Sequence, residues 1–111
     1  MVRLQHMLDA AREALSFAGG KTRGYLDTDR MLVLALTRDL EIIGEAASRV
    51  TPEGQESYPD IPWRDVIGMR NWLVHAYFDV DLDILWDTVA EDLPSLVAEI
   101  EKAIRLLDTA D

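Results

Sequence analysis

Apolar residues recur every three to four positions along most of the chain, the spacing of one face of an α-helix. The first such stripe covers residues 3 to 18, and Gly19-Gly20 is expected to end it. A second, longer stripe runs from about Arg30 to Val50, where Thr51-Pro52 stops it. The candidate N-terminal caps of this second helix are Asp27, Thr28 and Asp29.

The second half of the chain is interrupted by prolines and glycines. Residues 52 to 62 are predicted to form a polar loop anchored by Tyr58 and Ile61. A third helix is expected to start at Pro62, to contain Gly68 and to end near His75.

Two further helices are expected near the C-terminus. Asp81 can cap the fourth, and Pro94 marks either a kink or the first turn of a fifth over residues 94 to 108. No strand alternation lasts more than a few residues. The pattern therefore predicts an all-α, antiparallel bundle of four to five helices that forms one domain over residues 1 to 111.

Charge and composition narrow the possible functions. The formal net charge is −10, from 21 acidic and 11 basic residues, and there is no cysteine. A disulfide framework and a thiolate metal site are excluded, and a reducing cytoplasm is compatible with the chain. No run is apolar enough to span a bilayer, and the N-terminus does not resemble a signal peptide. The acidic balance disfavours a general nucleic-acid binder, which normally carries a basic face, and suits a basic partner protein.

The most informative stretch is residues 69 to 77, which carry the pattern R-x4-H-x-Y. Its members are Arg70, His75 and Tyr77. An imidazole can donate or accept a proton near neutral pH, and a guanidinium can hold a phosphate through two hydrogen bonds. Taken singly, each residue is more often structural than catalytic. Their joint spacing is what points to metal-free chemistry on a phosphodiester.

The spacing poses a geometric problem on a straight helix. His75 would lie about 140° around the helix from Arg70, although Tyr77 would lie near Arg70. Either the helix unwinds near His75, or the Arg70 side chain wraps around, or the two groups meet across a subunit boundary. Cleavage through a ribose 2′-hydroxyl needs both a base and an acid. A two-fold dimer would bring two copies of His75 into one cleft, so the chemistry favours a homodimer.

At these residues the chain resembles the HepT-like branch of the HEPN proteins. The segments that carry the resemblance are Leu40 to Ala47, Tyr58 to Asn71, His75 to Phe78, Val80-Asp81, Trp86 to Val89 and Asp92 to Pro94. The resemblance implies an all-α HEPN bundle that dimerises, with the motif lining a cleft between protomers. It also implies a metal-independent ribonuclease without a cofactor, the toxin of a type VII-like toxin–antitoxin pair whose antitoxin is a minimal nucleotidyltransferase.

The resemblance also suggests a role for each motif residue. Arg70 and His75 match the two catalytic positions, Asn71 matches the polar residue after the arginine, and Tyr77 matches the hydroxyl that the partner modifies with AMP. An alternative is a non-catalytic helical dimer that docks the nucleotidyltransferase, which the acidic charge favours.

Other candidate sites are weaker. Asp79, Asp81 and Asp83 alternate but lack the glycine and terminal glutamate of a calcium loop, so caps and solvated carboxylates are expected. Gly19 to Thr22 resembles the tail of a phosphate loop but follows no strand, so it is interpreted as a helix stop. Carboxylates also line the long helix at Asp39, Glu41 and Glu45. The tryptophans at 63, 72 and 86 are expected to pack in the core or an interface for the most part.

Overall fold

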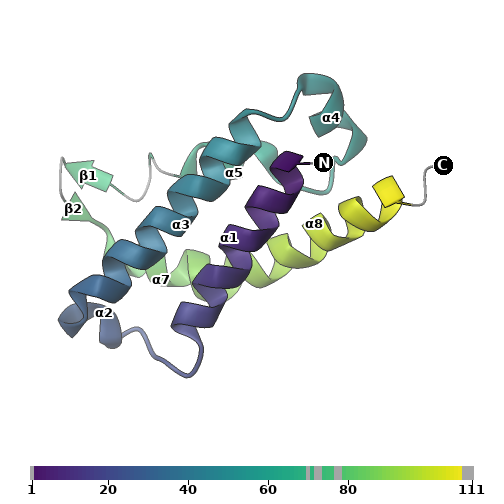
Figure 1. Cartoon of the computed structure of the whole chain (residues 1–111). Helices are drawn as coiled ribbons and strands as arrows, with labels where there is room; N and C mark the ends of the chain where they lie inside the picture. The colour runs from purple at the N-terminus through teal and green to yellow at the C-terminus, as the bar shows by residue number, and fades with distance from the viewer. Residues whose placement is uncertain (1, 70, 72–73, 77–78, 109–111) are drawn as a thin grey trace.

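In the computed structural model, helices account for most of the chain (Figure 1). The structure describes residues 2–69, 71, 74–76 and 79–108. Two short strands, β1 (Val74–Ala76) and β2 (Asp79–Val80), pair antiparallel. The α-helices are α1 (Val2–Ala18), α2 (Tyr25–Thr28), α3 (Arg30–Ser48), α4 (Pro52–Ser57), α5 (Trp63–Ile67), α7 (Leu82–Asp87) and α8 (Leu93–Asp108). The all-α class predicted from the sequence is confirmed.

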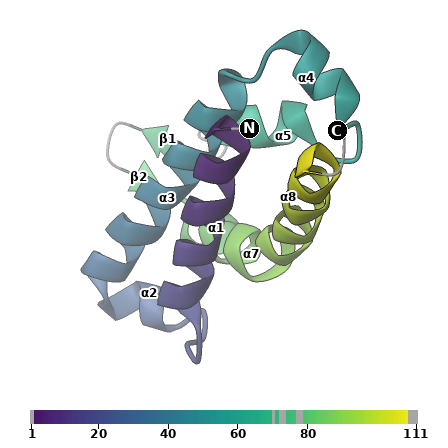
Figure 2. The same ribbon diagram turned by 45° about the vertical axis from the view of Figure 1, so that its right-hand side comes forward.

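Helices α1 and α3 form an antiparallel pair that runs side by side in both views (Figures 1 and 2). Gly20 follows α1 with φ of +75°, a conformation that a residue with a Cβ rarely adopts. At the start of α3, the Asp29 side chain accepts a hydrogen bond of 3.0 Å from the Leu32 amide. Asp29 is therefore the N-terminal cap among the three candidates. The end of α1 and the start of α3 both follow from local chemistry.

The C-terminal helices follow one another without a loop. Asp81 caps α7 by accepting a 3.0 Å hydrogen bond from the Ile84 amide. A π-helical turn (Thr88–Asp92) then leads into α8, and Pro94 lies in the first turn of that helix. Because proline has no amide hydrogen, the regular helical hydrogen bond cannot be made there, and the backbone widens just before it. Of the two expectations for Pro94, the first turn of a further helix is confirmed.

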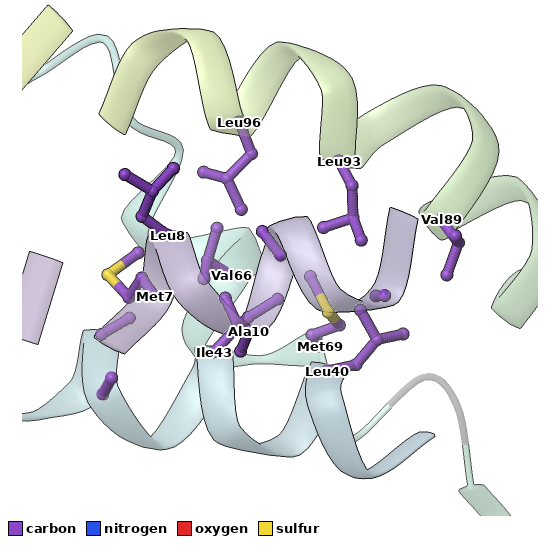
Figure 3. Close-up of a cluster of buried hydrophobic side chains, with 14 of the residues drawn as sticks. Met7, Leu8, Ala10, Leu40, Ile43, Val66, Met69, Val89, Leu93 and Leu96 are labelled. Atoms are coloured by element: carbon purple, nitrogen blue, oxygen red, sulfur yellow. The ribbon is translucent and has the colours of Figure 1, made fainter. Parts of the chain in front are cut away.

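The core lies between α1, α3 and α8, and α5 contributes the buried Val66 to it (Figure 3). The helices contribute apolar stripes that face inward, as the spacing predicts. In the described part of the chain, no helix is both long and apolar enough to cross a membrane. The largest fully buried side chains are Met7, Leu36, Leu40, Ile43, Leu85, Leu93, Ile100, Val33 and Val89.

Two expectations about the middle of the chain are wrong. Residues 52 to 57 are not loop but form α4, because Thr51 caps it by accepting a hydrogen bond of 3.1 Å from the Gly54 amide and Pro52 fits the first turn. The third helix does not continue to His75. It ends at Ile67, with Gly68 as its C-terminal cap, and residues 74 to 76 form β1 instead.

Candidate functional site

The four candidate site residues lie on the segment between α5 and β2. Asn71 has helical backbone, is exposed, and donates its amide to the Gly68 carbonyl at 2.9 Å. His75 is the middle residue of β1. Arg70 and Tyr77 lie outside the described residues. The structure thus establishes the backbone course on either side of the motif, and the chemical roles remain predictions.

The start of the segment is fixed by the anchoring of α5. Trp63 is buried, and its indole N–H donates to the Tyr58 carbonyl at 3.0 Å. Ile61, just before the helix, is also buried. The two predicted anchors, Tyr58 and Ile61, therefore hold α5 against the core, and the expected packing role of Trp63 is confirmed.

A glycine lets α5 approach α3 closely. A Cβ placed on Gly44 of α3 would lie 3.2 Å from the carbonyl oxygen of Val66 in α5. That distance is tighter than most real Cβ contacts, so a larger side chain would push α5 away. Met69, which directly precedes the motif arginine in the sequence, is buried as well. The helix that precedes the motif, α5, thus packs directly against α3.

The end of the segment is fixed by the hairpin. Val74 pairs with Val80 and Ala76 pairs with Asp79, and the register shifts between Val74 and Ala76. His75 therefore occupies a bulge-like irregularity in the strand pairing. Such irregularities re-aim side chains and are frequent beside active sites. Asp81 directly follows β2 and caps α7, so the hairpin leads straight into that helix.

This backbone resolves the geometric problem posed by the sequence. The 140° separation of Arg70 and His75 applies only to one continuous helix. Because α5 ends at Ile67 and His75 lies in a strand, that constraint does not hold. Of the three alternatives, a helix that ends before His75 is the one the described backbone supports.

Two hollows adjoin the helix that leads into the motif. One, of about 530 Å³, includes Ile67 at the end of α5 and is lined by cations as well as carboxylates, among them Arg3, Arg38, Glu41 and Glu45. The other, of about 390 Å³, includes Met69. Its apolar floor is surrounded by four carboxylates, those of Asp60, Asp65, Asp92 and Glu99. Of the two hollows beside this helix, the one at Ile67 therefore has charges of both signs and the one at Met69 is acidic.

The sequence alone does not indicate that Asp39 differs from the other carboxylates of α3. Only 2% of its surface is exposed, on a helix face that it shares with buried leucines. The pKa of this carboxyl is raised to about 7, most of all by burial and also by a hydrogen bond with Glu13 and repulsion from its carboxylate, while the charge of Arg38 acts in the opposite direction. The signal in the sequence that could have indicated this burial is the position of Asp39 within the apolar stripe of α3.

Two of the three alternating carboxylates have the roles expected from the sequence. Asp81 is a helix cap, and Asp83 pairs with Arg23 at 2.7 Å, so neither is committed to a calcium loop. Across residues 2–69, 71, 74–76 and 79–108, no group of three or more His, Asp or Glu side chains is arranged to hold a metal ion.

Comparison with known proteins adds an independent line of evidence. Residues 7–103 match the family model described as "Ribonuclease HepT-like". A Methanocaldococcus jannaschii protein named "Putative RNase MJ1380" is 35% identical over 98 residues, which cover 88% of this chain and 90% of that protein. A Thermococcus cleftensis protein named "Probable ribonuclease HepT" is 47% identical over 74 residues, or 67% of each chain. No solved structure matches this chain significantly.

Proposed function

We propose that this chain, which belongs to the HepT-like ribonuclease family, is an endoribonuclease whose active site is formed by Arg70 and His75. The observation that carries the proposal is the extent of the family match. It spans residues 7–103 and therefore includes the whole R-x4-H-x-Y segment. The register shift between Val74 and Ala76 supports it, because irregularities of strand pairing are frequent beside active sites.

The proposed reaction uses the RNA's own 2′-hydroxyl as the nucleophile. A neutral imidazole takes the proton of that hydroxyl, and the oxygen attacks the adjacent phosphorus. The bond from phosphorus to the 5′-oxygen breaks, and an imidazolium returns a proton to the leaving oxygen. The products are a 2′,3′-cyclic phosphate and a free 5′-hydroxyl. Arg70 would stabilise the extra negative charge on the phosphorane-like transition state, and Asn71 would orient His75 or the phosphate.

The base and the acid are proposed to come from two copies of the chain. The only other histidine is His6, an exposed residue of α1. A homodimer with two-fold symmetry would place both copies of Arg70 and His75 in one cleft. In this arrangement one imidazole starts neutral and the other protonated, which gives a bell-shaped dependence of the rate on pH.

Regulation by a partner belongs to the same proposal. A minimal nucleotidyltransferase antitoxin would transfer AMP from ATP to the Tyr77 hydroxyl and release pyrophosphate. The added phosphate would compete with RNA for Arg70, so one modification would block both binding and cleavage. Incubation with the neighbouring nucleotidyltransferase and ATP should add the mass of one or more AMP units to the wild type and none to Tyr77→Phe.

Chemical analysis of the cleaved ends tests the proposed ribonuclease. Purified protein should cut RNA in the presence of EDTA, because the proposed mechanism needs no metal. The upstream fragments should end in a 2′,3′-cyclic phosphate, and RNA with a 2′-O-methyl group at the cleavage site should resist. Upstream products that end in a 3′-hydroxyl, or cleavage that stops with EDTA, would contradict the mechanism.

A second candidate function is supported by one specific observation. The hollow that includes Met69 has four carboxylates around an apolar floor, which would repel RNA phosphates and suit a basic, partly apolar protein segment. A non-catalytic dimer that docks the nucleotidyltransferase would use such a surface. In that case the purified protein should bind the nucleotidyltransferase tightly yet leave RNA intact over the whole pH range.

A further inference from the structure

A further hollow lies between α1 and α3, the two helices that run side by side in Figures 1 and 2, and it borders the 530 Å³ hollow at His6 and Ile42. Its volume is about 250 Å³. Helix α1 contributes His6, Asp9, Ala10 and Glu13, and α3 contributes Asp39 and Ile42. Three of these six side chains are carboxylic acids, and they come from two different helices.

Asp39 is the unusual member of this group. Only 2% of its surface is exposed, and in the described part of the chain its Oδ2 atom has no hydrogen-bond partner. A buried carboxylate oxygen without a donor is costly, and helix packing alone would be better served by an apolar residue. The interaction with Glu13 thus leaves Oδ2 available to accept a hydrogen bond that the described chain does not supply.

The chemistry of the hollow selects the kind of group that it can bind. Carboxylates repel phosphate, so an RNA strand is excluded as the occupant. The described residues offer no cluster arranged to hold a metal ion. An organic cation remains, and a guanidinium fits best, because it is planar, donates to two carboxylates at once and is less strongly hydrated than an ammonium.

The size of the hollow indicates a side chain rather than a free ligand. Pockets for small molecules usually measure about 300 to 1,000 Å³, and this one is smaller. Arginine side chains that fill small, desolvated hollows commonly supply much of the energy of protein interfaces. The net charge of −10 favours a basic partner, whereas a second copy of this chain would bring the same negative charge.

We propose that the hollow between α1 and α3 receives an arginine side chain from a basic partner protein, with Asp39 and Glu13 as its acceptors. Oδ2 of Asp39 has no contact with solvent, so the exposed Glu13 side chain must first change rotamer. The guanidinium then bridges the two carboxylates, one pair of N–H groups to each. This site is independent of the proposed ribonuclease chemistry.

The test uses the full chain and two short peptides. Acetyl-Gly-Arg-Gly-amide is the probe, and the same peptide with citrulline, the neutral analogue of arginine, is its control. Binding is followed by the NMR shifts of the backbone amides of α1 and α3 at pH 8. The arginine peptide should shift amides around Asp39 and Glu13 in a saturable way, and the citrulline peptide should shift them far less.

Variants separate this site from general attraction to an acidic protein. Asp39→Asn should weaken binding of the arginine peptide about tenfold or more, and Glu13→Gln, at the exposed rim, several-fold. Glu56→Gln removes the same charge from an exposed position of α4 and should leave the affinity unchanged. Far-UV circular dichroism establishes that each variant is folded.

Three results would overturn the proposal. Equal binding of both peptides would show that charge plays no part. Unchanged affinity in both Asp39→Asn and Glu13→Gln would place the arginine elsewhere. Absence of binding of the arginine peptide would contradict the proposal, and weaker self-association of Asp39→Asn in sedimentation would then make a second copy the occupant.

Discussion

Replacing Asp39 by asparagine should change how stability depends on pH. The pKa of this buried carboxyl is raised from 3.8 to about 7, with burial as the largest cause. The native state therefore holds a proton that the unfolded chain has already lost between these two values. The stability contributed by this group is fully present below about pH 4 and is lost as the pH rises through about 7.

The size of the effect follows from the shift. One pKa unit corresponds to about 1.4 kcal/mol, so the two units between pH 5 and the folded pKa correspond to about 3 kcal/mol. Because the hydrogen bond and the charge of Glu13 contribute to this shift, the value is an upper bound for burial of Asp39 alone. The asparagine side chain has no charge to bury at any of these pH values. The stability of Asp39→Asn relative to the wild type should therefore rise by up to that amount between pH 5 and pH 8.

Urea unfolding followed by circular dichroism at pH 5, 6, 7 and 8 measures this difference directly. Glu56→Gln, at an exposed position, is the matched control and should follow the wild type at every pH. A difference between Asp39→Asn and the wild type that stays constant over this range would refute the reasoning. It would mean that Asp39 is ionised in the native state throughout, despite its burial.

Two further predictions concern elements that position the site. Gly44→Val should destabilise the fold by about 1 to 3 kcal/mol, because the new side chain would press on the Val66 carbonyl and displace α5. It should also lower any RNA cleavage. Thermal unfolding measures the loss of stability, and a cleavage assay measures the loss of activity. Asp29→Ala should cost about 1 kcal/mol in urea unfolding by removing the cap on the Leu32 amide, and Asp29→Asn should restore most of it.

Features of the fold that depend on local chemistry could be predicted from the sequence. Gly20, Asp29 and Asp81 each act within a few residues of their own position, so the helix boundaries that they set were recognisable. Thr51-Pro52 was also recognised as a boundary. The sequence predicts this boundary only as the end of the long helix, although the same residues also start α4.

Three features do not follow from the sequence pattern, and one of them depends on a contact between segments far apart in the chain. Val74 to Ala76 belong to the stretch in which the third helix is expected to end, and they pair with β2 instead. Gly68 is expected inside the third helix, whereas it is the C-terminal cap of α5. Asp39 is buried because α1 packs over α3, which the stripe of α3 alone does not reveal.

The central claim is that His75 is a catalytic acid or base, and the cleavage rate of His75→Ala under single-turnover conditions tests it most directly. The account predicts a loss of about 10²- to 10⁴-fold with the fold intact, and partial recovery when imidazole is added. Arg70→Ala should lose a comparable amount, whereas Arg64→Ala, which removes an exposed cation from nearby α5, should cleave normally. Full activity in His75→Ala would contradict the account and leave His75 a residue of the hairpin alone.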